Sequence, residues 1–187
     1  YHPLGMVTTG FNPRNRFQVS NIVPTETDTY FRQQTLQGDV HDEGASMFGG
    51  VAGHAGLFSD AYDLSLLYQM LLNGGEINGK RYLKPATIKL FTAYNSDISR
   101  RGLGFDKPEK DNSIREEPYP STLASPETFG HTGFTGTCVW VDPSTDLVYI
   151  FLSNRVYPTR NNNKLGQMIK KKKFREEHRL FIAEGNK

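Results

Sequence analysis

The chain has 187 residues, 36% of them hydrophobic and 12% aromatic, which is enough to bury a sizeable core in one domain or the larger part of one. It carries 22 Lys and Arg against 20 Asp and Glu, a formal net charge of +2. This near balance gives no reason to expect nucleic acid or a membrane surface as a partner. The single cysteine, Cys138, excludes an intrachain disulfide and a zinc site built from several cysteines. No apolar run reaches the roughly 18–20 residues of a membrane span.

The first residues, Tyr1-His2-Pro3-Leu4-Gly5, lack an initiator Met, a basic start and an apolar signal region. We therefore expect the chain to come from a longer protein whose targeting signal lies upstream. Residues 1–40 are rich in Pro, Thr, Asn and Gly, which predicts mostly irregular structure with short extended pieces. Residues 41–58 are dense in glycine and predict a tight loop in which backbones approach closely.

Two helices and a hairpin are predicted next. Apolar residues recur at three- and four-residue spacing over residues 61–71, with Ser59 or Asp60 before them as a cap, and Asn73-Gly74-Gly75 ends the pattern. Asn78-Gly79 is a hairpin turn signal. Pro85 is well placed in the first turn of a shorter helix that runs to about Phe91.

Three strands are predicted at residues 129–132, 137–141 and 147–153. The turn sequence Asp142-Pro143-Ser144-Thr145-Asp146 separates the last two, so we expect an antiparallel meander. The third strand is almost entirely apolar, which predicts that both of its faces are covered.

Two segments beside these strands are strongly charged. Residues 106–128 are charged and rich in proline, and predict a long excursion or lid. From Asn163 the chain predicts a final helix, in which the run Lys170 to Lys173 forms a basic, solvated face and not a nucleic-acid site.

The sharpest motif is Gly130-His131-Thr132-Gly133-Phe134-Thr135-Gly136-Thr137. It resembles the third motif of the penicillin-recognising serine hydrolases, which reads Lys-Thr-Gly in β-lactamases and penicillin-binding proteins. Histidine replaces the lysine in some esterases and peptidases of the branch related to class C β-lactamases. The resemblance implies that His131 and Thr132 bind the substrate, that Gly133 lets the substrate backbone approach, and that the Phe134 N–H is an oxyanion-hole donor.

Three further stretches resemble the same family in the same order. They are residues 1–6, the glycine-rich run 51–59 and residues 152–158, so the resemblance covers about residues 1–165. It makes His131, Thr132 and Phe134 the candidate catalytic residues. The candidate substrate-binding residues are Gly133, His54, Ala55 and Asn154.

The resemblance implies an α+β fold of the β-lactamase/transpeptidase-like type, with an antiparallel sheet flanked by helices. On this interpretation residues 1–187 are the C-terminal part of one such domain. It contains a loop-rich region at 1–58, helices and the lid at 59–128, and sheet strands with a C-terminal helix at 129–187.

The chain departs from the family in its nucleophile. No serine is followed three residues later by lysine, although Ser-x-x-Lys supplies the family's nucleophile and its base. Tyr-x-Asn and Ser-x-Asn are also absent, and Gly-x-Ser-x-Gly fails at Gly44-Ala45-Ser46-Met47-Phe48, so we interpret Ser46 as a loop residue. We therefore expect the chain by itself to be inactive.

The function implied is that of a serine hydrolase acting through an acyl-enzyme on an ester, amide, peptide or β-lactam. The expected partners are a small-molecule or peptide substrate, the missing upstream half of the domain, and a fused glycoside hydrolase domain. No nucleic acid, membrane or cofactor is expected, and the setting implied is extracytoplasmic, in the periplasm. The competing hypothesis is a non-catalytic module of the same fold that binds a ligand or partner.

Two histidines in the glycine-rich region allow a second interpretation. His41, Asp42 and His54 are residue types that bind zinc. Their spacing fits no ligand pattern, so we expect no metal there and favour hydrogen bonding that organises the loop.

Overall fold

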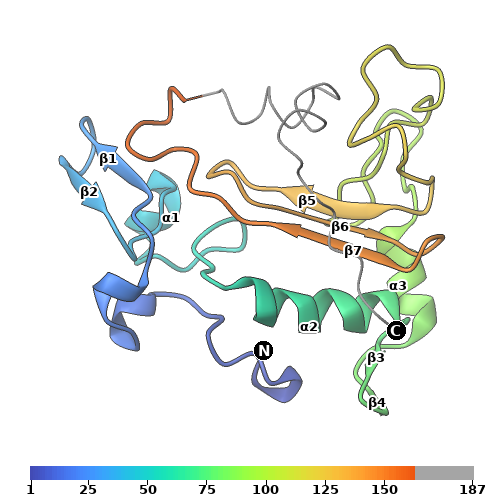
Figure 1. Cartoon of the computed structure of the whole chain (residues 1–187), viewed down its shortest axis with the longest axis horizontal. Helices are drawn as coiled ribbons and strands as arrows, with labels where there is room; N and C mark the ends of the chain where they lie inside the picture. Colours follow the sequence, from blue (N-terminus) through green and yellow to red (C-terminus); the bar gives the residue numbers. More distant parts are fainter. Residues whose placement is uncertain (163–187) are drawn as a thin grey trace, which may run out of the picture. The chain divides into compact units, whose positions relative to one another are not determined.

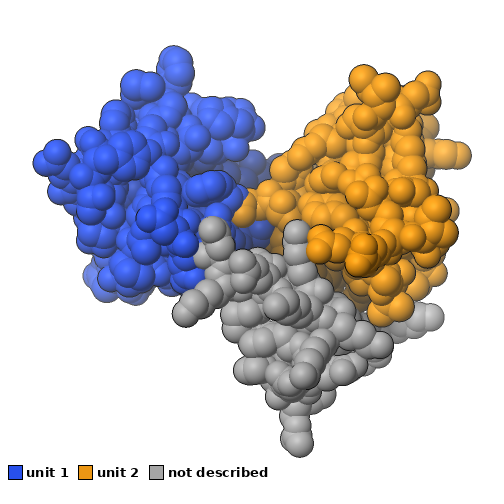
Figure 2. All heavy atoms as spheres, turned by 90° about the horizontal axis from the view of Figure 1, so that it is seen from above, with its two compact units in different colours: residues 1–64, 134–137, 152–179 blue, residues 65–133, 138–151, 180–187 orange. Residues whose placement is uncertain are grey.

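The computed structural model describes residues 1–162. The helix predicted from Asn163 and its lysine run lie outside the described residues. The chain forms two compact units (Figure 2). Of the described residues, the first unit contains 1–64, 134–137 and 152–162, and the second contains 65–133 and 138–151.

The second unit contains a three-stranded antiparallel sheet of order β5-β6-β7 (Figure 1). Its strands are β5 (Phe129–Thr132), β6 (Cys138–Asp142) and β7 (Leu147–Phe151). Gly130 pairs with Trp140 across one ladder, and Trp140 pairs with Tyr149 across the other. The predicted meander is confirmed.

The central strand β6 is mostly buried. Val139, Trp140 and Val141 are all buried. The strand ends at the buried Asp142, whose carboxylate accepts hydrogen bonds from the hydroxyls of Ser125 (2.6 Å), Thr128 (2.9 Å) and Ser144 (2.7 Å). Burial raises the pKa of Asp142, but these hydrogen bonds lower it by a larger amount and hold it below its usual range. The carboxylate therefore ties the β6–β7 turn to the segment that leads into β5.

The prediction that β7 is covered on both faces is wrong for the part of the chain that is described. All five residues from Leu147 to Phe151 are half-buried, and β7 is an edge strand of the three. The apolar run indicated that the faces of β7 need to be buried, but not which segment buries them.

The two predicted helices and the hairpin between them are confirmed. Helix α2 is Ala61–Leu72 and α3 is Pro85–Thr92. Between them β3 (Glu76–Ile77) pairs with β4 (Lys80–Arg81) through a turn in which Asn78 and Gly79 have φ of 50° and 72°. Positive φ at both turn residues is the type I′ geometry that Asn-Gly favours.

The segment predicted as a lid begins inside the core. Asp106, Lys107 and Pro108 are almost fully buried, and Asp106 forms an antiparallel bridge with Gly130. Lys107 donates a hydrogen bond to the Thr128 carbonyl at 3.0 Å. Burial lowers the pKa of Lys107 to about 8. Asp106 therefore adds one bridge beside β5, and any excursion starts after the buried Pro108.

The first unit is built mainly from short elements. It has 3-10 turns at His2–Leu4, Pro13–Asn15 and Val19–Asn21, a hairpin of β1 (Glu26–Asp28) and β2 (Gln34–Leu36), and helix α1 (Glu43–Met47). The irregular character of residues 1–40 is confirmed. The loop predicted for residues 41–58 is wrong at α1, where the Asp42 carboxylate caps the helix by accepting from the Ala45 N–H at 2.7 Å.

A buried carboxylate joins the start of α2 to the N-terminal segment within this unit. One oxygen of Asp63 accepts four hydrogen bonds of 2.7–2.8 Å from the backbone N–H groups and hydroxyls of Thr8 and Thr9. Asp60 caps α2, as predicted, by accepting from the Asp63 N–H at 2.9 Å.

None of the helices in the described part of the chain is long and apolar enough to cross a membrane.

Candidate active site

Strand β5 carries the His-Thr-Gly motif from the core to the surface of the second unit. Phe129 and Gly130 are buried, whereas His131 and Thr132 are exposed. The Phe129 ring packs edge-on against Phe105 with centroids 5.1 Å apart, which anchors the buried end of the strand. The predicted strand and the accessibility of His131 are confirmed; the groove beside it stays a prediction.

Gly130 is required by the sheet itself. A Cβ at this position would lie 2.0 Å from the Val139 carbonyl oxygen and 2.7 Å from the Trp140 ring. No real Cβ approaches a backbone atom so closely, so β5 and β6 can pair here only around a glycine. The first residue of the motif therefore has a packing role.

The side chain of His131 has defined partners at both ring nitrogens. Its Nε2 lies 2.7 Å from Nη1 of Arg101, and its Nδ1 lies 2.7 Å from the carbonyl oxygen of Thr132. Arginine has donors and no acceptor, so the first contact is an N–H of Arg101 donating to a lone pair on Nε2. The Nδ1–H then donates to the Thr132 carbonyl.

The segment that carries Arg101 is held by an acidic residue beside the sheet. Nε and Nη2 of Arg100 bind the two carboxylate oxygens of Asp106 at 2.7 and 3.0 Å, and the Tyr119 hydroxyl donates to the same carboxylate at 2.9 Å. Burial raises the pKa of Asp106, but hydrogen bonds from Arg100 and Tyr119 bring it below its usual range. Asp106 therefore stays ionised and fixes the chain next to Arg101.

In the first unit, Phe134 is held through its side chain. Its ring stacks on the imidazole of His41, with centroids 5.4 Å apart and 29° between the planes. The guanidinium of Arg155 lies 4.9 Å from the same ring centroid. Nearby, the Ser153 hydroxyl donates to the Gly136 carbonyl at 2.7 Å. These contacts fix the turn that carries the Phe134 N–H.

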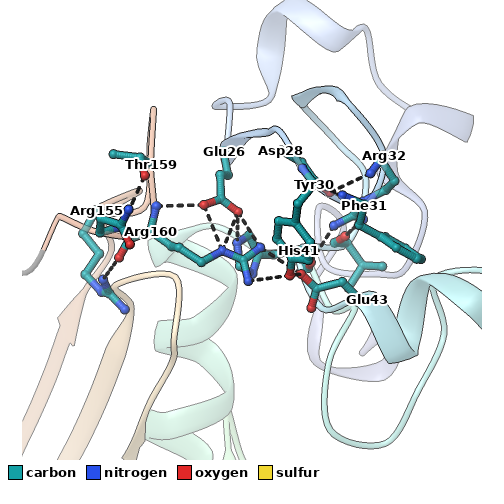
Figure 3. A network of polar contacts seen from close by, with 12 residues as sticks. Glu26, Asp28, Tyr30, Phe31, Arg32, His41, Glu43, Arg155, Thr159 and Arg160 are labelled. Carbon is teal, nitrogen blue, oxygen red and sulfur yellow. Dashed lines mark hydrogen bonds and ion pairs between the residues drawn. The ribbon is translucent and has the colours of Figure 1, made fainter.

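His41 belongs in turn to a buried charged network (Figure 3). Its Nε2 lies 2.8 Å from the carboxylate of Glu26, to which Arg160 donates from Nε and Nη2 at 3.0 and 2.7 Å. Arg160 also binds Glu43 at 2.8 Å. Burial raises the pKa of Glu26, yet the hydrogen bonds from Arg160 and His41 outweigh it and lower the pKa to about 2.

The glycine-rich region places His54 beside the cap of α1. Nε2 of His54 lies 3.0 Å from the Asp42 carboxylate, and the His54 side chain is 64% exposed. The backbone turns tightly here, since the N–H of Ala52 donates to the carbonyl of Ala55 at 3.2 Å. A Cβ at Gly56, where φ is 108°, would lie 2.2 Å from the Gly50 carbonyl oxygen. The interpretation that His41 and His54 organise this region by hydrogen bonding is confirmed.

The seven predicted site residues are distributed over both units. His131, Thr132 and Gly133 belong to the second unit, and Phe134, His54, Ala55 and Asn154 to the first. Asn154 is half-buried and its side-chain amide donates to the Pro24 carbonyl at 2.9 Å. That bond explains how Asn154 is held.

Two other candidate groups lack the geometry of a reactive site. Burial raises the pKa of Cys138 to about 11, so its thiol is protonated near neutral pH. Ser46 lies in α1, and in residues 1–162 no hydrogen bond joins its hydroxyl to a histidine. The described part of the chain also contains no group of three or more His, Cys, Asp or Glu that could hold a metal.

Sequence reasoning missed Arg101 and the contacts of Phe134. Arg101 is thirty positions before His131, and a single arginine in a charged stretch carries no local sign of that pairing. The partner of Glu26, Arg160, is even further away along the chain. These pairs of residues meet only in the folded chain, and their positions in the sequence do not predict the contact.

Comparison with known proteins identifies the family. A profile of the beta-lactamase family matches residues 1–171, and the chain belongs to this family. A protein of Escherichia coli K12 named "Putative D-alanyl-D-alanine carboxypeptidase" is 37% identical in an alignment of 180 positions, which covers 87% of this chain and 41% of that protein. A protein of the same name from Salmonella enteritidis PT4 is 37% identical over 90% of this chain and 41% of its own length. The chain therefore spans about two-fifths of the length of these curated relatives.

A solved structure was also matched. It is a penicillin-binding protein homolog from Caulobacter crescentus, 26% identical, with a TM-score of 0.42 over 54% of this chain and 27% of that one.

Proposed function

We propose that residues 1–187 are the C-terminal part of a serine hydrolase that works through an acyl-enzyme. The nucleophile and its lysine would be supplied by a segment that precedes Tyr1, and this chain would supply the third motif of the site. The observation that carries the proposal is the exposed end of β5, where His131 and Thr132 reach the surface from a buried strand. Membership of the beta-lactamase family supports it.

In this proposal each residue of the motif has a chemical task. The Phe134 N–H donates to the oxyanion that forms when the nucleophile attacks the carbonyl, together with the N–H of the nucleophile itself. Thr132 binds the substrate from the end of β5, beside the imidazole of His131. Gly133, without a side chain, lets the substrate lie against the strand. His54, Ala55 and Asn154 would border the substrate.

The proposed substrate is a peptide, or an ester, amide or β-lactam that resembles one. Two relatives bear the name "Putative D-alanyl-D-alanine carboxypeptidase", which favours a peptide with a free C-terminal carboxylate. Substrates of that kind would place the protein outside the cytoplasm, in the periplasm, and a fused glycoside hydrolase domain would fit the same setting. The second candidate function is a non-catalytic module that binds such a ligand through the same residues.

The experiment compares the full-length protein with residues 1–187. Both are incubated with a p-nitrophenyl ester, a chromogenic cephalosporin and a serine-directed phosphonate. We expect the full-length protein to turn over at least one substrate and to be labelled at a serine upstream of Tyr1, and the shorter chain to stay at background. Ligand binding without turnover or labelling by the full-length protein would favour the non-catalytic module. Labelling of Ser46 would place the nucleophile in this chain.

A further inference from the structure

The peptide bond that carries the proposed oxyanion donor has a flexible residue on one side. Gly133 precedes the Phe134 N–H, and a glycine has no side chain to restrict its backbone dihedrals. Among the described residues, no backbone carbonyl accepts a hydrogen bond from the Phe134 N–H. The direction of this N–H therefore depends on what holds Phe134 through its side chain and through the turn that follows it.

The ring of Phe134 contacts two groups of the first unit. The His41 imidazole stacks on it with centroids 5.4 Å apart, and the Arg155 guanidinium lies 4.9 Å from its centroid. Phe134 is nevertheless 60% exposed, so these contacts restrain the ring in place of burial in a core. Because the ring is joined to the Cα beside this N–H, a fixed ring limits the rotation of the peptide bond.

His41 is itself held at its ring and at its backbone (Figure 3). Its Nε2 lies 2.8 Å from the Glu26 carboxylate, and its side chain is only 9% exposed. Nη2 of Arg32 donates to the His41 carbonyl at 2.7 Å, and Nε of the same guanidinium pairs with the buried Asp28 at 3.0 Å. Charged partners thus anchor both parts of His41, and its imidazole offers the Phe134 ring a rigid surface.

We propose that His41 is a positioning residue: its anchored ring sets the direction of the Phe134 N–H as an oxyanion-hole donor. The inference rests on the proposed function and extends it to a residue outside the His-Thr-Gly motif. A donor of this kind is effective when its direction is fixed before charge develops, because no reorganisation is then needed during the reaction. His41 acts only through Phe134 and not on the substrate.

The test measures how strongly the full-length protein depends on this donor. p-Nitrophenyl acetate and p-nitrophenyl thionoacetate have the same leaving group and differ only in the carbonyl oxygen, which is sulfur in the second. Sulfur is a weak hydrogen-bond acceptor, so a well-directed N–H accelerates attack on the oxygen ester far more. His41→Gln can still donate to Glu26 but has no ring. We expect its kcat/KM to fall roughly 10- to 100-fold on the acetate and less than about 3-fold on the thionoacetate.

Two further variants separate positioning from stability. His41→Phe keeps a ring against Phe134 and gives up the hydrogen bond to Glu26, so its kcat/KM on the acetate should stay within about 5-fold of the wild-type value. Asp63→Asn is the matched control, since Asp63 is a buried carboxylate of the same unit whose hydrogen bonds go to Thr8 and Thr9. It should lower stability and leave the ratio of the two kcat/KM values within about 2-fold of wild type.

The outcomes separate this inference from the proposed function. An equal fall on both esters in His41→Gln, or unchanged rates on both, overturns the inference while hydrolysis stands. A His41→Phe variant as impaired as His41→Gln also overturns it, because a ring would then not be enough to position the donor.

If the full-length protein cleaves neither ester, or the thionoacetate too slowly to measure, the NMR order parameter of the Phe134 amide decides. Its resonance is assigned by its loss in Phe134→Leu. An order parameter of about 0.85 in the wild-type protein and in His41→Phe, falling below about 0.6 in His41→Gln, would support positioning without reference to turnover. The same order parameter in all three proteins would refute it.

Discussion

The imidazole of His41 stacks on the ring of Phe134 while its Nε2 lies 2.8 Å from the Glu26 carboxylate. This relationship connects a buried charged network to the residue whose N–H is the proposed oxyanion donor. His41 is therefore more than a partner for Glu26: its ring is one face of the contact that fixes the turn after Gly133.

Replacing His41 tests that connection. His41→Ala removes a buried hydrogen bond to a charged group together with the stacking contact, and should lower the free energy of unfolding by roughly 2 kcal/mol. His41→Phe keeps a ring against Phe134 and should cost less. Urea unfolding of the full-length protein measures both. His54→Ala, which removes the exposed pair with Asp42, is the matched control and should stay within about 0.5 kcal/mol; a control as costly as His41→Ala would contradict the argument.

The Glu26 network predicts acid sensitivity. The pKa of Glu26 is about 2 in the folded protein against an ordinary 4.5, so its ionised form stabilises the fold. This contribution, roughly 3 kcal/mol, is fully present above pH about 5 and is lost as pH falls towards 2. Glu26→Gln should be less stable at pH 7 and show a flatter decline in unfolding free energy between pH 5 and 2.

The matched control for that series is Glu76→Gln, which removes an exposed ion pair with Arg81. It should cost at most about 1 kcal/mol and keep the slope of the wild-type protein. An equally steep decline in Glu26→Gln would mean that other carboxylates set the acid limit.

Gly130→Ala should damage the sheet. The new methyl group would meet the Val139 carbonyl oxygen at 2.0 Å, so β5 and β6 would have to separate at the base of the motif. We expect a loss of at least about 2 kcal/mol, seen as a lower Tm in thermal unfolding. Gly53→Ala places its methyl in open space and should shift Tm little; similar Tm values for both variants would show that the strands adjust freely.

Asp63→Asn should be costly although it is nearly isosteric. An amide oxygen can accept from Thr8 and Thr9, but the charge that strengthens those bonds is lost, and the new NH2 group has no acceptor in the described structure, where Oδ1 of Asp63 is unpaired. We expect a loss of roughly 2–3 kcal/mol by urea unfolding. Asp60→Asn retains a good capping residue and should cost less than about 1 kcal/mol; the reverse order would refute this ranking.

The elements that sequence reasoning predicted well are those whose signal is local. Helix α2 has apolar periodicity, a capping Asp60 and a glycine end, and the three strands are separated by strong turn residues. Helix α1 was missed because its five residues lie in a glycine-dense stretch and are too few for periodicity. The prediction that both faces of β7 are covered was wrong because an apolar run indicates burial without identifying the segments that would pack on the strand.

In the candidate site, too, features with a local signal were predicted and those set by distant residues were not. The exposure of His131 at the end of a strand followed from the motif and its flanking turns. The hydrogen bond between His131 and Arg101 did not, because Arg101 lies thirty residues earlier in the chain. The contacts of the Phe134 ring likewise depend on His41 and Arg155, whose side chains reach this ring only after the first unit has folded.

The position of β7 has a practical consequence for work with this chain alone. Its residues Leu147 to Phe151 are apolar, β-branched or aromatic, and no strand within residues 1–162 pairs with its outer edge. Such an edge is a template for intermolecular strand pairing and for amyloid-like stacking. Concentrated stocks of residues 1–187 should therefore convert with time into sheet-rich assemblies that bind thioflavin T. A lysine at Val148 or Ile150, which puts charge on the edge, should slow that conversion.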